Sequence, residues 1–188
     1  MSNQIRTFIA VELSEDVKNQ LDKVQDMLRD CAVEIKWVES FNFHLTLKFL
    51  GKIKEEQLVE IKAVLSEIAS NRDSFEIEIS EIGAFPSLDY PRVIWSGIDK
   101  GEQKLIELQS ELESELLNLD FAPEDRQYTP HITLGRLKDE AREKVLSEQL
   151  KEYPISYTLD DEVSAITLFK SELTEKGPKY TVIDKYWF

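Results

Sequence analysis

The sequence predicts an α+β fold in which antiparallel sheets are covered by helices on one side. Segments with the two-residue period of strands alternate with segments with the helical period, and about halfway along the chain this pattern starts over. The 188 residues are 41% hydrophobic and include only 6 Gly and 6 Pro, which suffices for a substantial core. No Ser/Gly-rich linker separates the halves, so we expect a single domain spanning residues 1–188.

The first half opens with strand-forming residues, followed by Ser14, a residue suited to cap a helix whose first turn holds Glu15 and Asp16. Apolar residues then recur at helical spacing in two segments and alternate with acidic residues in a third. The expected elements are, in order, a strand over 5–13, a helix marked by Val17, Leu21, Val24 and Leu28, strands over 34–38 and 43–50, a helix marked by Leu58, Ile61, Leu65 and Ile68, a half-buried strand over 75–80, a loop between Pro86 and Pro91, and a strand over 93–97.

The second half repeats the alternation. Its long helix has an apolar stripe and otherwise mostly acidic residues, which we interpret as a solvated face. The expected elements are a helix marked by Leu105, Leu108, Leu112 and Leu116, a strand over 128–134, a short helix capped by Asp139 and carrying Ala141, Val145 and Leu146, and strands over 163–169 and 180–184 that flank a turn at 176–178.

Composition excludes several classes of protein. The single cysteine, Cys31, cannot form an intrachain disulfide, and no signal peptide or membrane-spanning helix is recognisable, so a cytoplasmic protein is expected. Lys and Arg total 23 against 37 Asp and Glu, a net charge of −14. No basic cluster of the kind that grips duplexes is evident, so we expect no binding of long duplex nucleic acid and only short, local contact with any nucleic acid.

Both histidines of the chain lie in the same local motif. His44-Leu45-Thr46-Leu47 is repeated as His131-Ile132-Thr133-Leu134. On a strand, residues i and i+2 project from one face, so each imidazole stands beside a threonine hydroxyl. The same spacing directs Phe43, Leu45, Leu47 and Phe49 into the core and Lys48 onto the histidine face.

Two such strands facing one another would surround a small anion with two titratable rings and two hydroxyl donors. Displacement at phosphorus needs a base for the incoming oxygen and an acid for the departing one. With an ordinary pKa of roughly 6.5, one imidazole can be neutral and the other protonated near pH 7. The threonines can stabilise charge on the phosphate oxygens. This chemistry requires no cofactor, no metal and no nucleophilic side chain.

These motifs resemble those of the 2H phosphoesterase superfamily, and more narrowly those of the RNA 2′,3′-cyclic phosphodiesterases, also called 2′-5′ RNA ligase or LigT-like proteins. The likeness covers nearly the whole chain. It is carried by RTFIAV at 6–11, WV at 37–38, FHLTLKFLG at 43–51, GAFP at 83–86, PRVIWSG at 91–97, PHITLGR at 130–136, FKSEL at 169–173 and GPKY at 177–180.

The resemblance implies a bilobal pseudo-two-fold duplication with helices on the outer faces and a central cleft. It further implies metal-independent opening of a terminal 2′,3′-cyclic phosphate to a 2′-phosphomonoester, with His44 as general acid and His131 as general base. It also implies a capacity to join RNA ends through a 2′-5′ bond, with the histidines exchanging roles. RNA ends or nucleotides with a cyclic phosphate are the expected partners, no membrane is involved, and a monomer is expected.

Three further side chains are candidates. Arg136 could bind the phosphate if the chain turns at Gly135; Tyr128 could stack on a base; and Lys48 could contact substrate from the histidine face. Two other functions stay open at this point. One is the same chemistry on a small cyclic phosphate that is not RNA, and the other is a non-catalytic module that binds phosphate or RNA ends.

Overall fold

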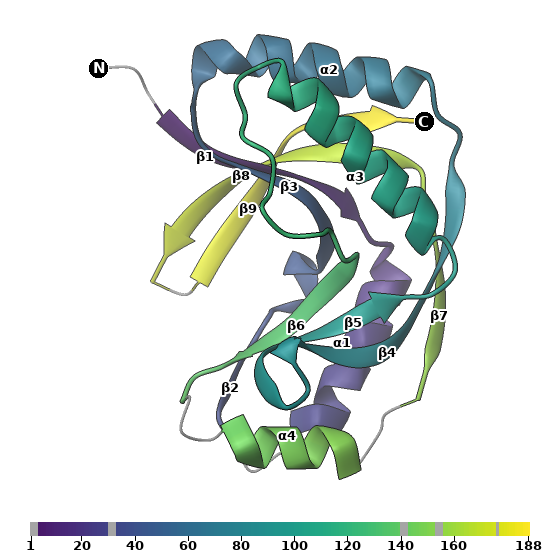
Figure 1. Cartoon of the computed structure of the whole chain (residues 1–188), viewed down its shortest axis with the longest axis vertical. Helices are drawn as coiled ribbons and strands as arrows, with labels where there is room; N and C mark the ends of the chain where they lie inside the picture. The colour runs from purple at the N-terminus through teal and green to yellow at the C-terminus, as the bar shows by residue number, and fades with distance from the viewer. Residues whose placement is uncertain (1–3, 30–32, 140–142, 153–155, 176) are drawn as a thin grey trace.

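A computed structural model describes residues 4–29, 33–139, 143–152, 156–175 and 177–188. Among them, nine antiparallel strands form one curled sheet in the order β7-β4-β5-β6-β3-β1-β8-β9, and β2 pairs with β6 beside this path (Figure 1). The strands are β1 (Gln4–Glu12), β2 (Ile35–Trp37), β3 (His44–Lys54), β4 (Phe75–Ser87), β5 (Tyr90–Ile98), β6 (His131–Leu137), β7 (Thr158–Val163), β8 (Ala165–Thr174) and β9 (Gly177–Trp187).

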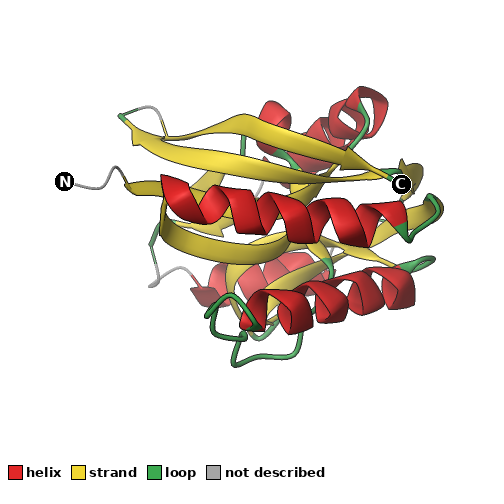
Figure 2. Ribbon diagram, turned by 90° about the horizontal axis from the view of Figure 1, so that it is seen from above, coloured by secondary structure: helices red, strands yellow, loops and turns green. Residues whose placement is uncertain are grey.

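Four α-helices and two short 3-10 helices accompany the sheet in the described part of the chain (Figure 2). They are α1 (Glu15–Arg29), α2 (Leu58–Ser70), α3 (Glu102–Leu117), α4 (Glu143–Glu152), η1 (Ser40–Asn42) and η2 (Glu55–Gln57). None of these helices is long and apolar enough to cross a membrane. The expected apolar stripes are confirmed, because all of the marked leucines of α3 are 0% exposed. The expected cap is confirmed as well, since the Val17 N–H donates to Ser14 Oγ.

The sheet has two similar halves, and its midline lies between β3 and β6. One half contains β3, β1, β8 and β9, and the other contains β6, β5, β4 and β7. The halves are not consecutive in sequence, because the C-terminal hairpin β8–β9 returns to β1. Helix α1 follows β1 in the sequence but packs behind the half of the sheet that contains β6. There, Gln25 Nε2 donates to the carbonyls of Val38 and Leu134. The expected bilobal α+β architecture is therefore built from exchanged segments on one continuous sheet.

Several predicted boundaries are wrong. The second motif strand begins at His131 rather than at residue 128, and the loop expected between Pro86 and Pro91 is a two-residue turn at 88–89 between long strands. Strand β7 was not predicted, because only Leu159 and Val163 of this charged edge segment are buried. Helix α4 is present with Leu146 buried, whereas Cys31 and Ala141 lie outside the described residues.

Candidate active site

The two histidine motifs lie side by side at the middle of the sheet. Strands β3 and β6 are antiparallel neighbours, and Leu45 is opposite Ile132. This register sets His44 beside Thr133 and His131 beside Thr46. Two segments 87 positions apart are thereby joined into one polar face, which we call the site face, while Leu45 and Ile132 are fully buried on the other.

Both imidazoles are held in the same way by the backbone. His44 Nδ1 lies 2.6 Å from the carbonyl oxygen of Asn42, and His131 Nδ1 lies 2.7 Å from that of Thr129, in each case two residues earlier. A carbonyl oxygen only accepts hydrogen bonds, so Nδ1 must carry a proton in both rings. The tautomer is thus fixed, and each Nε2 is left to take up or release a proton.

Aromatic rings surround His44 on its half of the sheet. Phe8 of β1 lies 5.0 Å from the imidazole centroid, and Tyr180 of β9 meets it edge-on at 5.3 Å. Phe169 of β8 stacks on Phe8, with the two centroids 5.1 Å apart. These contacts hold the ring of His44 in place and remove much of its surface from water.

His131 has an equivalent wall on the other half. Phe85 of β4 meets the imidazole edge-on at 4.8 Å, and Trp95 of β5 lies 6.2 Å away. Trp95 lies across Gly83, where an added Cβ would come within 2.1 Å of the indole. A side chain at position 83 would displace this wall, so the glycine is required for the close approach.

Burial lowers the pKa of both histidines. Desolvation by the surrounding rings is the largest cause for His44 and lowers its pKa to about 4, with the charges of His131 and Lys18 acting in the same direction and the Asn42 carbonyl opposing them. Desolvation also lowers the pKa of His131, helped by the charge of Arg136 and opposed by the Thr129 carbonyl. Both shifts favour the neutral ring near pH 7, whereas the ordinary pKa of roughly 6.5 would let one imidazole be protonated there.

A β-bulge brings Arg136 onto the site face. Thr133 pairs with Trp95 but Gly135 pairs with Ile94, so Leu134 is an extra residue in β6. Leu134 and Gly135 are both buried, and the exposed side chain of Arg136 returns to the side of His131 and Thr133. Its charge acts on the titration of His131. The bulge supplies the change of direction at Gly135 that Arg136 needs in order to reach the site face.

The equivalent bulge in β3 overturns two predictions. Ala10 pairs with Thr46 and Ile9 pairs with Lys48, which makes Leu47 the extra residue. Lys48 consequently faces the helices with 1% of its side chain exposed, so it cannot contact substrate from the site face as predicted. Phe49, expected in the core, is 59% exposed on the site face and its ring lies 6.0 Å from that of Phe8.

Lys48 and Tyr128 connect the first motif strand to α3 and to the segment that leads into the second motif. Lys48 Nζ donates to Glu113 Oε2 at 2.7 Å and to the Ala122 carbonyl at 2.9 Å. Tyr128 donates its hydroxyl to the carbonyl of Thr46 at 3.0 Å, and burial raises its pKa. Tyr128 packs against the core, so the structure places it as a link between the first motif and the segment that enters the second.

Both threonines lie half-buried on the site face, as predicted. Within the part of the chain that the structure describes, neither the Thr46 nor the Thr133 hydroxyl has a hydrogen-bond partner. Each is therefore available to donate to an anion placed between the rings.

Sequence reasoning assigned no role to the aromatic walls. The walls consist of Phe8, Phe169 and Tyr180 beside His44 and of Phe85 and Trp95 beside His131. A signal did exist, since all five lie in the stretches that carry the family resemblance, yet their residue types are equally typical of a core.

Comparison with known proteins shows what the chain resembles. The family described as LigT like Phosphoesterase matches residues 11–95 and 98–180. An RNA 2′,3′-cyclic phosphodiesterase of Methanothermobacter thermautotrophicus is 36% identical over 97% of this chain and 98% of the relative. An RNA 2′,3′-cyclic phosphodiesterase of Methanocaldococcus jannaschii is 37% identical over 97% and 100%. The crystal structure of the protein TT0787 of Thermus thermophilus superimposes with a TM-score of 0.83 at 30% identity, covering 97% of each chain.

Proposed function

The chain belongs to the LigT-like phosphoesterase family, and we propose that it hydrolyses the 2′,3′-cyclic phosphate at the 3′ end of RNA to a 2′-phosphomonoester. The observation that carries the proposal is the matched pair of imidazoles on β3 and β6. In each ring Nδ1 is bound to a backbone carbonyl, and Nε2 has no hydrogen-bond partner among the described residues. A module that only bound phosphate would need donors, not two proton-transferring groups. The names of the relatives favour RNA ends over a small cyclic phosphate.

In the reaction, Nε2 of His131 removes a proton from water as the water oxygen attacks phosphorus. The bond between phosphorus and O3′ breaks, and Nε2–H of His44 protonates the departing O3′. The products are a 3′-hydroxyl and a 2′-phosphomonoester, and the two histidines have exchanged protonation states. An RNA 5′-hydroxyl in place of water would give a 2′-5′ linkage by the same proton transfers. The assignment of acid and base follows the family resemblance.

The remaining polar groups of the site face stabilise the phosphate. Thr46 and Thr133 donate to its non-bridging oxygens, and the Arg136 guanidinium balances the negative charge that develops there. The exposed ring of Phe49 offers a surface on which a base can stack. The bound anion also raises the pKa of His44, because an opposite charge nearby favours the protonated ring. Bound substrate thus favours the protonated form of His44, which acts as the general acid.

The direct test is an assay with a cyclic-ended oligoribonucleotide in the presence of a chelator of divalent cations. We expect turnover to be unchanged by the chelator and the product to carry its phosphate on O2′, as identified by NMR or chromatography. A product with the phosphate on O3′, or no turnover, would contradict the proposed cleavage.

The pH dependence provides a further prediction. The competent enzyme has one imidazole protonated and one neutral, so kcat/KM, which reports the free enzyme, peaks between the two histidine pKa values. The pKa of His44 is lowered to about 4 and that of His131 is also lowered, so the peak should lie below pH 6.5. The alkaline limb of kcat should lie at higher pH, because bound phosphate raises both values. A kcat/KM that increases steadily to pH 8 would show that the free-enzyme histidines are not shifted in this way.

A further inference from the structure

Four basic side chains lie on the site face around the histidines, in two pairs of cross-strand neighbours. Arg6 of β1 is opposite Lys52 of β3, and Lys36 of β2 is opposite Arg136 of β6. All four are exposed. One pair lies on each half of the sheet, so the acidic chain carries a local positive region that its overall composition hides.

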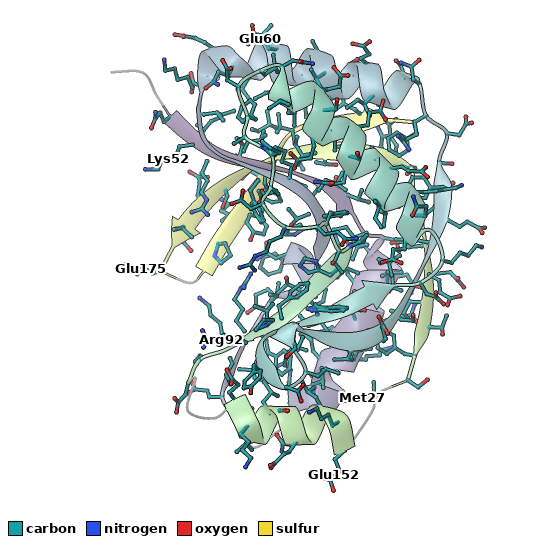
Figure 3. The ribbon with its side chains drawn as sticks, in the orientation of Figure 1. Met27, Lys52, Glu60, Arg92, Glu152 and Glu175 are labelled. Carbon is teal, nitrogen blue, oxygen red and sulfur yellow. The ribbon has the colours of Figure 1, made fainter. Side chains whose placement is uncertain are left out.

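The face of the first pair follows from strand alternation. The register shifts between β1 and β3 insert extra residues only in β3, so Arg6 projects from the same side of β1 as Phe8, whose ring contacts His44. Ile5 and Ile9 project from the opposite side and pack in the core. Lys52, directly across from Arg6, shares its face. Figure 3 shows Lys52 at the outer end of these strands, away from the helices.

These four cations have no acidic partner among the residues that the structure describes. Basic residues elsewhere, such as Lys62 and Lys48, form ion pairs, whereas these four, within the described chain, leave their charges uncompensated on one face. Unpaired like charges gathered on one face repel one another. Such an arrangement is complementary to an external polyanion.

Arg6 and Lys52 lie along β1 and β3 beyond the histidine pair, on the half of the sheet that does not contain Arg136. Ala10 pairs with Thr46 at the centre of the site, and Arg6 is four residues further along β1, or about 13 Å at the usual rise of a strand. The charges of Arg6 and Arg136 both act on the hydroxyl of Tyr180, lowering its pKa against the larger effect of burial. Tyr180, whose ring contacts that of His44, is therefore near enough to both guanidinium groups for their charges to act on it.

We propose that Arg6 and Lys52 form a second phosphate subsite, which binds a backbone phosphodiester on the 5′ side of the reacting end. The inference rests on the proposed function. The cyclic phosphate terminates the 3′ end, so the rest of an RNA substrate can extend only in the 5′ direction. Arg136 and Lys36 are then left for the reacting phosphate and its surroundings. The substrate class that fits is a single-stranded oligoribonucleotide, not a cyclic mononucleotide.

The test compares a cyclic mononucleotide with a cyclic-ended hexaribonucleotide in the double variant Arg6→Gln/Lys52→Gln. For the hexaribonucleotide we expect kcat/KM to fall about tenfold or more, and the slope of log kcat/KM against log salt to become shallower by about 1.4, or about 0.7 for each basic side chain that no longer neutralises a phosphate. For the mononucleotide we expect a change of less than about twofold. The matched control is Lys23→Gln/Lys144→Gln, which removes the same charge from exposed positions on α1 and α4.

The outcomes separate the subsite from the proposed function. Selective loss on the hexaribonucleotide, beyond that of the control variant, supports the subsite. Equal losses on both substrates, or a loss no larger than that of the control, overturn the subsite. The proposed hydrolysis is not affected by that result, because it rests on the activity of the parent protein. If the parent protein hydrolyses neither substrate, the proposed function is refuted. Results with the Arg6 and Lys52 variants alone cannot refute it.

Discussion

Replacing His44 or His131 by alanine is expected to lower kcat for cyclic-phosphate hydrolysis by about 10²- to 10⁴-fold. Each ring supplies one proton transfer through Nε2, and the carbonyls of Asn42 and Thr129 fix the tautomer that makes this transfer possible. The double variant should be little worse than the more impaired single variant, because groups that act in one step are not additive. Single-turnover rates at saturating substrate, with circular dichroism to verify folding, provide the measurement.

The two roles can be distinguished by the leaving group. A nucleoside phosphodiester that releases p-nitrophenolate needs no proton on the departing oxygen, so loss of the general acid should matter little. We therefore expect His44→Ala to keep most of its activity on such a substrate and His131→Ala to remain impaired. The opposite pattern would reverse the assignment of acid and base. Parent-like rates of both variants on the cyclic phosphate would remove the histidines from the reaction altogether.

Strand periodicity was sufficient to predict that each histidine shares a face with a threonine. His44 and His131 repeat one local motif, and alternation on a strand placed each threonine beside its imidazole without any knowledge of the fold. The apolar stripe of α3 was equally clear, because Leu105, Leu108 and their equivalents recur at helical spacing and are fully buried. Such local features follow from the chain alone.

The β-bulges at Leu47 and Leu134 could not be predicted from the sequence. A single extra residue reverses every later side chain on a strand, and whether it is present depends on the neighbouring strand, not on local pattern. The bulge at Leu47 exchanges the expected faces of Lys48 and Phe49, and the bulge at Leu134 returns Arg136 to the site face. The hydrogen bonds from Nδ1 to the carbonyls span only two residues, yet strand alternation does not predict them either.

The buried position of Lys48 leads to the largest expected change in stability. Its side chain is 1% exposed and that of Glu113 is 15% exposed, so Lys48→Ala leaves a nearly buried carboxylate without its cation and the Ala122 carbonyl without its donor. Removing one member of a buried ion pair typically costs about 3–5 kcal/mol in the free energy of unfolding. Urea denaturation monitored by tryptophan fluorescence, at constant pH and salt, measures the difference.

Two further variants separate burial from charge. Lys62→Ala breaks an ion pair with Asp184 whose members are 37% and 43% exposed, and it should cost less than about 1 kcal/mol because solvent screens the pair. Lys48→Met/Glu113→Leu removes both buried charges and should recover at least half of the stability lost in Lys48→Ala, since well-packed apolar residues often replace a buried pair without net cost. If Lys48→Ala were no more harmful than Lys62→Ala, the lysine would not be the buried link between the first motif strand and the segment that leads to His131.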